Sequence, residues 1–171
     1  MKFEIYSEAE CRRRLKAGAQ PDVVFSISDS KEANLKEKYE ILIYRFQFAD
    51  RVFEEDKEAP NISDVKRIVE IAKTLNTEQE IWFHCHAGIS RSSATALVVF
   101  SEMFGPEYAC EIVSTYKVFL SRGKDGEELF EDGSSWFVPN NLITKIYDKM
   151  TQKNLTELLE KYFDFYKPRF A

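Results

Sequence analysis

One nine-residue segment of this chain, His84 to Ser92, holds residues whose types and spacing could do chemistry, and it reads His-Cys-His-Ala-Gly-Ile-Ser-Arg-Ser. Cys85 carries a thiol, and the thiolate form of a cysteine is a strong nucleophile. Arg91, six residues later, can fold back over the intervening loop and offer its planar fork to two oxygens of a phosphate. This pair is suited to a site in which a cysteine nucleophile lies beside a bound tetrahedral anion such as phosphate.

The segment lies between an apolar run, Ile81 to His84, and a helical pattern of apolar residues. Open α/β sheets bind ligands at the carboxyl ends of their strands, where loop N–H groups and a helix N-terminus attract anions. We expect such a nest to favour the thiolate of Cys85, Gly88 to permit a tight turn near the anion, and Ser92 to ease departure of the thiolate. The residues expected to bind phosphate are His86, Ala87, Gly88, Ile89, Ser90 and Arg91.

Two other interpretations of the segment are weaker. Cys85 could be an ordinary buried core cysteine, but its flanking residues argue against that. His84 and His86 beside a cysteine could suggest zinc, yet alternate residues supply too few ligands and the chain has no other histidine. We expect no metal and no cofactor, with His84 supporting the loop through hydrogen bonds and His86 partly exposed at its rim.

Hydrophobic periodicity predicts an alternation of strands and helices around this segment. Strands are predicted over 3–6, 23–28, 41–48 and 81–84. Helices are predicted over 7–16, 62–75, 94–104, 106–120, 139–150 and 155–163, with Gly105-Pro106 as a stop and a new start, and a loop is predicted over 121–135. This order indicates a single α/β domain over 1–171, with a central, mostly parallel sheet flanked by helices and a helical, aromatic tail expected over 151–171.

The composition limits the partners of the chain. A formal net charge of −5 argues against a general affinity for nucleic acid. The charged opening is unlike a signal peptide and no apolar stretch is long enough to span a bilayer, so we expect no membrane association. Three scattered cysteines indicate a reducing, cytoplasmic setting rather than a disulfide framework.

Three further features have competing interpretations. Arg12-Arg13-Arg14 fits a solvated helix face better than a nucleic-acid patch. Cys110 has the position of a core residue, and the alternative is a resolving partner for an oxidised Cys85. The aromatic side chains of the tail would pack on the body or dock a partner. They are Tyr162, Phe163, Phe165, Tyr166 and Phe170.

The pattern His-Cys-x-x-Gly-x-x-Arg-Ser resembles the signature of the cysteine-based protein tyrosine phosphatases, and the layout of the chain is similar to their dual-specificity-like branch. A cysteine six residues before an arginine arises by chance in roughly one such chain in seven, so the flanking His, Gly and Ser carry the specificity. Pro139-Asn140 is similar to a Pro-Asn of that branch, which implies that Asn140 helps hold the phosphate loop. The stretch over 121–135 looks longer than usual, and the resemblance does not cover the residues after Met150.

The resemblance also implies a general acid on the loop after the preceding long strand, roughly thirty to thirty-five residues before the cysteine. Asp50 directly follows the strand predicted over 41–48, and Asp56 lies farther along the same loop. The run Phe48-Ala49-Asp50-Arg51-Val52 is similar to a pattern in some microbial relatives. Geometry favours Asp50 over Asp56 as the acid.

The function implied by the resemblance is hydrolysis of phosphotyrosine in a protein or peptide through a phosphocysteine, with dual specificity left open. One alternative on the same scaffold is a phosphoinositide or RNA 5′-phosphatase, which an acidic chain without lysine in the loop disfavours. Another is a phosphate-binding module without turnover, which usually lacks the Cys or the Arg. Rhodanese and arsenate reductase also place a reactive cysteine in an anion loop, but the two helices after the loop and Pro139-Asn140 favour a phosphatase.

Overall fold

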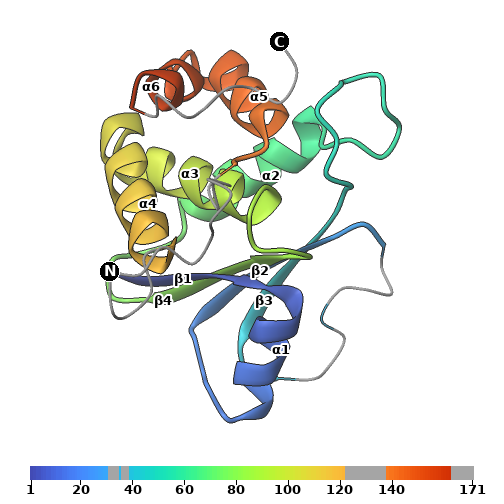
Figure 1. The fold of residues 1–171 in the computed structure, drawn as a ribbon, viewed down its shortest axis with the longest axis vertical. Helices are drawn as coiled ribbons and strands as arrows, with labels where there is room; N and C mark the ends of the chain where they lie inside the picture. Colours follow the sequence, from blue (N-terminus) through green and yellow to red (C-terminus); the bar gives the residue numbers. More distant parts are fainter. Residues whose placement is uncertain (31–34, 36–38, 122–137, 163–171) are drawn as a thin grey trace.

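Four parallel strands form one sheet in the order β1-β4-β2-β3, and the computed structural model shows helices on both of its faces (Figure 1). The structure describes residues 1–30, 35, 39–121 and 138–162. The strands are β1 (Lys2–Ser7), β2 (Val23–Ser28), β3 (Leu42–Gln47) and β4 (Glu80–Cys85). The predicted α/β domain with a parallel sheet is confirmed, and each strand ends within one residue of its predicted bounds.

Among the described helices, α1 (Glu8–Lys16) covers one face of the sheet and five others lie on the opposite side (Figure 1). These are α2 (Ile62–Ala72), α3 (Arg91–Phe104), α4 (Pro106–Ser121), α5 (Asn141–Thr151) and α6 (Leu155–Tyr162). Successive residues of a strand point to opposite faces. Val24 and Trp82 therefore pack in the cluster under α1, whereas Phe25 and Phe83 pack in the larger cluster on the other side.

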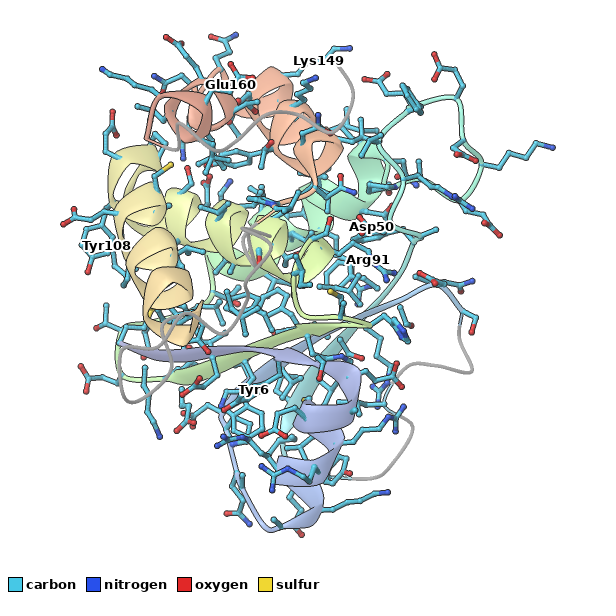
Figure 2. The ribbon with its side chains drawn as sticks, viewed as in Figure 1. Tyr6, Asp50, Arg91, Tyr108, Lys149 and Glu160 are labelled. Carbon is cyan, nitrogen blue, oxygen red and sulfur yellow. The ribbon has the colours of Figure 1, made fainter. Side chains whose placement is uncertain are left out.

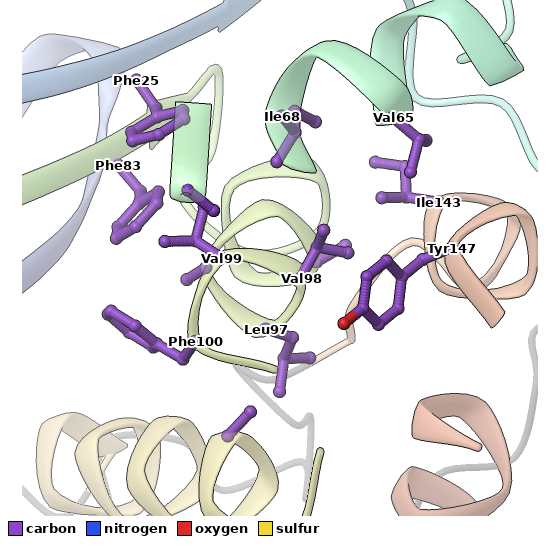
Figure 3. Close-up of a cluster of buried hydrophobic side chains, with 14 of the residues drawn as sticks. Phe25, Val65, Ile68, Phe83, Leu97, Val98, Val99, Phe100, Ile143 and Tyr147 are labelled. Atoms are coloured by element: carbon purple, nitrogen blue, oxygen red, sulfur yellow. The ribbon is translucent and has the colours of Figure 1, made fainter. Parts of the chain in front are cut away.

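Helix α3 packs on an aromatic core. The ring of Phe83 on β4 stacks against Phe25 on β2 at 5.0 Å and meets Phe100 on α3 edge-on at 5.6 Å (Figure 3). Every residue of α3 from Arg91 to Ser101 is buried, because this helix is packed between the sheet and the surrounding helices. The loop that joins β4 to α3 is thus held between two rigid elements.

Some predicted helix ends differ from those observed. The helix predicted over 94–104 begins at Arg91. The helix start predicted at Pro106 is confirmed, because proline is well suited to a first helical position. Ser121 belongs to α4 and not to a loop. Two predicted segments lie outside the described residues: the rest of the predicted loop, from residue 122 to 135, and the aromatic tail from residue 163 onward.

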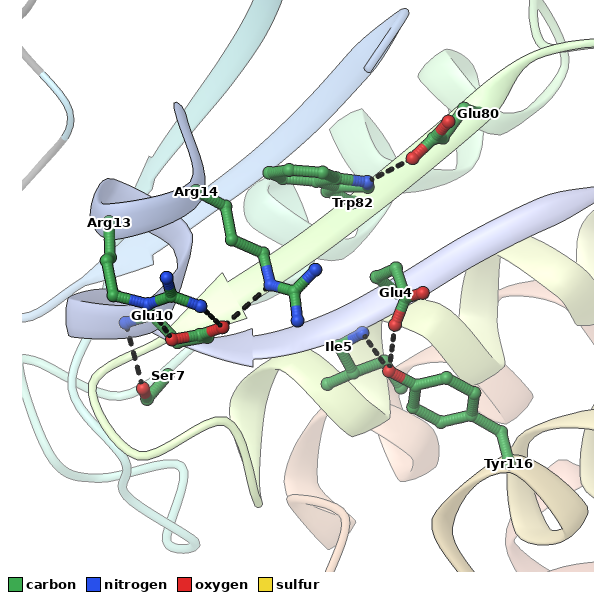
Figure 4. A network of polar contacts seen from close by, with 9 residues as sticks. All are labelled: Glu4, Ile5, Ser7, Glu10, Arg13, Arg14, Glu80, Trp82 and Tyr116. Carbon is green, nitrogen blue, oxygen red and sulfur yellow. Dashed lines mark hydrogen bonds and ion pairs between the residues drawn. The ribbon is translucent and has the colours of Figure 1, made fainter. Parts of the chain in front are cut away.

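The basic residues of α1 are paired along their own helix. Glu10 accepts hydrogen bonds from Arg13 and Arg14, both at 2.7 Å, and these bonds lower the pKa of Glu10 to about 2 (Figure 4). Arg12 pairs with Glu8 at 3.0 Å. Internal ion pairs of this kind support the interpretation of this stretch as a solvated helix face.

The other two cysteines are core residues. Cys110 on α4 and Cys11 on α1 are both fully buried, and burial raises the pKa of each thiol to about 12. Cys110 belongs to the same large cluster as Cys85, whereas Cys11 belongs to the cluster on the α1 face. The core position predicted for Cys110 is confirmed; its role as a resolving thiol stays a prediction.

Candidate active site

The strands end together at one edge of the sheet because they are parallel and paired without large offsets. Ser7 of β1 pairs with Cys85 of β4, and Ser26 of β2 pairs with His84. The segments that follow β2, β3 and β4 therefore converge at this edge. Figure 2 shows Asp50 and Arg91, from two of these segments, in neighbouring positions between the sheet and the helices.

Cys85 occupies the last position of β4 and is 2% exposed. Its Sγ lies 3.2 Å from Oγ of Ser92, which is buried in the first turn of α3. The first N–H groups of a helix have no partner within the helix and give its N-terminus a partial positive charge. A serine hydroxyl at this distance can exchange a hydrogen bond with the sulfur.

Gly88 fits the loop between Cys85 and Arg91 against the start of the chain. Its φ is 72°, and a Cβ placed there would lie 2.6 Å from the Ser7 nitrogen and 2.7 Å from the Tyr6 carbonyl oxygen. The same junction holds His86, whose carbonyl accepts a hydrogen bond of 3.2 Å from the Glu8 N–H. The side chain of His86 is exposed, as expected for a residue at the rim. The glycine is therefore required by both conformation and space.

Arg91 opens α3 and is only 4% exposed. Its Nη1 donates to the Phe48 carbonyl at 2.9 Å and to the carboxylate of Asp29. Its Nε is buried and has no hydrogen-bond partner among the described residues. A buried donor without a partner costs free energy, so a charged guanidinium held this way is suited to a ligand that accepts hydrogen bonds. A phosphate oxygen fits that requirement.

Asp50 is held by two donors at the mouth of this loop. Ser90 Oγ donates to Asp50 Oδ1 at 2.7 Å, and Asn140 Nδ2 donates to the same oxygen at 2.8 Å. Asn140 also donates to the Arg51 carbonyl at 2.9 Å, and its backbone N–H donates to the Ser90 carbonyl at 3.2 Å. The fold thus brings together the candidate nucleophile, an arginine, a carboxylic acid and the asparagine that the resemblance assigned to loop support.

Comparison with known proteins bears on the fold of the chain. No family model matches the sequence, and no curated protein does. Among solved structures, the chain is similar to OH1 from the Orf virus, which is described as a tyrosine phosphatase with distinct structural features and triple substrate specificity. The TM-score is 0.53 and the sequence identity is 19%, and the match covers 87% of this chain and 82% of OH1. The fold is that of a tyrosine phosphatase. A second similar structure is a mutant form of Tk-PTP, with a TM-score of 0.44, 12% identity and coverage of 93% of this chain and 91% of that one.

Asp56, the rival acid, occupies a different place in this phosphatase fold. Its carboxylate lies 3.7 Å from Nε of Arg51, and both side chains are largely exposed on the loop between β3 and α2. No hydrogen bond or ion pair among the described residues links Asp56 to the segment from His84 to Ser92. The geometry therefore favours Asp50 as the acid, as the sequence order did.

Asp29 is a site residue that the sequence analysis missed. It follows β2 directly, its side chain is 66% exposed, and it forms the ion pair with Arg91. The available signal was its position: Asp29 comes directly after β2, which ends at Ser28, just as Asp50 comes shortly after β3, which ends at Gln47. In a parallel sheet both positions lie at the ligand-binding edge. By engaging Nη1, Asp29 orients the guanidinium and leaves Nε for a ligand.

His84 directly precedes Cys85 in β4 and is fully buried. Neither ring nitrogen has a hydrogen-bond partner among the described residues, so the hydrogen bonds expected to support the loop are not present there. Burial, followed by the positive charges of Arg12 and Arg91, lowers the pKa of His84 to about 4. The imidazole is therefore neutral at pH 7.

Within the described residues, no cluster of three or more His, Cys, Asp or Glu side chains could hold a metal ion.

The depressed pKa of His84 predicts a loss of stability in acid. The unfolded chain takes up a proton near the ordinary value of 6.5, whereas the folded chain resists it until about 4. The contribution of His84 to the free energy of unfolding is therefore fully present above pH 6.5. It is lost as the pH decreases to about 4, and the loss is about 3 kcal/mol. Urea unfolding between about pH 7 and pH 4 should show this loss in the wild type, and His84→Gln should lose about 3 kcal/mol less. Equal losses in the two proteins would contradict the assignment.

Proposed function

We propose that this protein is a phosphatase that hydrolyses phosphate monoesters through a phosphocysteine intermediate. The observation that carries the proposal is the buried Arg91, whose Nη1 is engaged by Asp29 and Phe48 while its Nε has no partner among the described residues. Cys85 lies in the same loop, beside the Ser92 hydroxyl. A nucleophile and an anion-binding donor in one loop are what attack on a phosphoryl group requires.

The reaction has two steps. Sγ of Cys85 attacks phosphorus in line, so that an S–P bond forms while the P–O bond to the leaving group breaks and Asp50 protonates the leaving oxygen. Water then attacks the phosphocysteine, a new P–O bond forms, the S–P bond breaks, and Asp50 takes up a proton from the water. Arg91 and the loop N–H groups of residues 86–90 stabilise the charge on the equatorial oxygens. Ser92 donates to the departing thiolate.

A phosphorylated protein or peptide is the substrate class that the surroundings support best. Phosphotyrosine is the first candidate, in keeping with the fold shared with OH1, described as a tyrosine phosphatase. The loop after Asp50 exposes four carboxylates, those of Glu54, Glu55, Asp56 and Glu58. Such a loop repels a polyanion, which argues against phosphoinositides and RNA 5′-phosphates.

The proposed setting is a reducing compartment such as the cytoplasm. All three cysteines are free thiols, and an oxidising compartment would threaten a reactive Cys85. None of the helices in the described part of the chain is long and apolar enough to cross a membrane.

Hydrolysis of para-nitrophenyl phosphate by the wild type and by Cys85→Ser, each with and without a chelator, tests the proposal. We expect turnover that resists the chelator in the wild type, and a loss below detection in Cys85→Ser with the thermal unfolding temperature preserved. Quenching the wild type in acid during turnover should trap phosphate on Cys85. Activity that survives in Cys85→Ser, or that the chelator removes, would overturn the phosphocysteine mechanism. A folded wild type that binds phosphate without turnover would instead identify a binding module.

A further inference from the structure

Asn140 joins three parts of the active site through separate atoms. Its Oδ1 accepts hydrogen bonds from the N–H groups of Leu142 and Ile143, at 3.1 and 3.2 Å, and so caps the N-terminus of α5. Its backbone N–H donates to the carbonyl of Ser90 in the phosphate loop. Its Nδ2 donates to Asp50 and to the carbonyl of Arg51. The side chain is 1% exposed, so water does not compete for these bonds.

The two donors that reach Asp50 select one of its oxygens. Both Ser90 Oγ and Asn140 Nδ2 bond to Oδ1, and no hydrogen bond to Oδ2 is present among the described residues. A protonated carboxyl group has one O–H donor, and an oxygen that already accepts two hydrogen bonds is the poorer place for that proton. The transferable proton therefore belongs on Oδ2.

We infer that Asn140 is a positioning residue for the general acid, and that with Ser90 it clamps Oδ1 of Asp50 so that Oδ2 carries the proton to the leaving group. The inference rests on the proposed function, and it assigns Asn140 a role beyond support of the phosphate loop. Asn140 also bonds to the Ser90 carbonyl and to the Arg51 carbonyl. It therefore fixes the position of the loop that carries Asp50 relative to the phosphate loop. Proton transfer depends on how far Asp50 lies from the bound phosphate ester, since an acid acts only within hydrogen-bond reach of the leaving oxygen.

The separate atoms allow the clamp to be removed without the helix cap. Asn140→Ser keeps a strong N-cap residue and the backbone bond to Ser90, and it loses only the Nδ2 donor. A matched control exists at Asn61, which caps α2 through its Oδ1 and has no hydrogen bond to Asp50 among the described contacts. Asn61→Ser makes the same chemical change at a second cap.

The test is the dependence of kcat/KM on the leaving group, which reports the first chemical step. Asn140→Ser should lower kcat/KM about tenfold for phenyl phosphate, whose leaving group needs the proton, and less than about twofold for para-nitrophenyl phosphate. Asn61→Ser should match the wild type on both substrates. In a double-mutant cycle, Asn140→Ser should add no further loss to Asp50→Asn, because a positioned acid is no longer present.

The outcomes separate the inference from the proposed function. If Asp50→Asn leaves the dependence on the leaving group unchanged, the assignment of the acid fails. If Asp50→Asn steepens it and Asn140→Ser lowers both substrates equally, or behaves as Asn61→Ser does, the positioning role is overturned. Thermal unfolding reports whether Asn140→Ser folds. Asn140→Asp, which keeps the cap but places a second carboxylate beside Asp50, gives an independent variant and should show an equal or larger selective loss on phenyl phosphate.

Discussion

Arg91→Lys should reduce kcat/KM for para-nitrophenyl phosphate by about 10³-fold while the chain stays folded. Lysine keeps the positive charge beside Asp29, so no carboxylate loses its counter-charge. It is a point charge, however, and cannot hold the Phe48 carbonyl and Asp29 with one nitrogen while it presents another donor to the phosphate. The loss should therefore be in binding of the phosphoryl group and in stabilisation of the transition state.

Competition by vanadate or inorganic phosphate measures the same effect without turnover, and the inhibition constant should rise with Arg91→Lys. A matched control is Arg67→Lys, because Arg67 also donates to a backbone carbonyl, that of Arg45, at 2.8 Å. That variant should retain wild-type kinetics. Retention of activity within about tenfold by Arg91→Lys would show that its planar fork is not what binds the phosphate.

Asp50→Asn should lower kcat/KM for phenyl phosphate by about 10² to 10³-fold and affect para-nitrophenyl phosphate much less. The amide cannot donate a proton from a carboxyl oxygen, and a poor leaving group depends on that proton. Because the same carboxylate serves as base in the second step, the phosphocysteine should accumulate, and a burst of nitrophenolate should precede slow turnover.

Asp56→Asn provides the control for Asp50→Asn. It removes the same charge from the same loop, but Asp56 contacts Arg51, and no described contact joins it to the phosphate loop. It should therefore leave the dependence on the leaving group as in the wild type. A steeper dependence in Asp56→Asn, with a wild-type dependence in Asp50→Asn, would move the acid to Asp56.

Local patterns were sufficient to indicate the candidate active site and to locate the elements around it. Cys85 and Arg91 are six residues apart, so a single loop between a strand and a helix brings them together. The strand patterns were equally local: β2 and β4 are recognisable because most of their residues are apolar and lie in short runs. Even the order in which Asp50 follows its strand is local, because the end of a parallel strand lies at the ligand-binding edge.

The contacts that tune the site join residues distant in sequence. Asp29 meets Arg91 across 62 residues, and Asn140 meets Asp50 across 90. Gly88 must be glycine partly because the backbone of Tyr6 and Ser7 lies against it. Spacing in the sequence does not encode such contacts, because they depend on which strands become neighbours.

The order of amino acids alone predicts the proposed nucleophile and phosphate-binding loop and specifies the parallel α/β architecture, since each depends on short-range spacing and hydrophobic period. Tertiary packing sets the strand order β1-β4-β2-β3, which places β4 between β1 and β2. That order follows from burying the two faces of the sheet at once, under α1 on one side and under the remaining described helices on the other. It alone brings the segments after β2 and β3 and the start of α5 to Arg91 and Asp50, because burial of the whole core, and not any local pattern, selects which strand ends lie together.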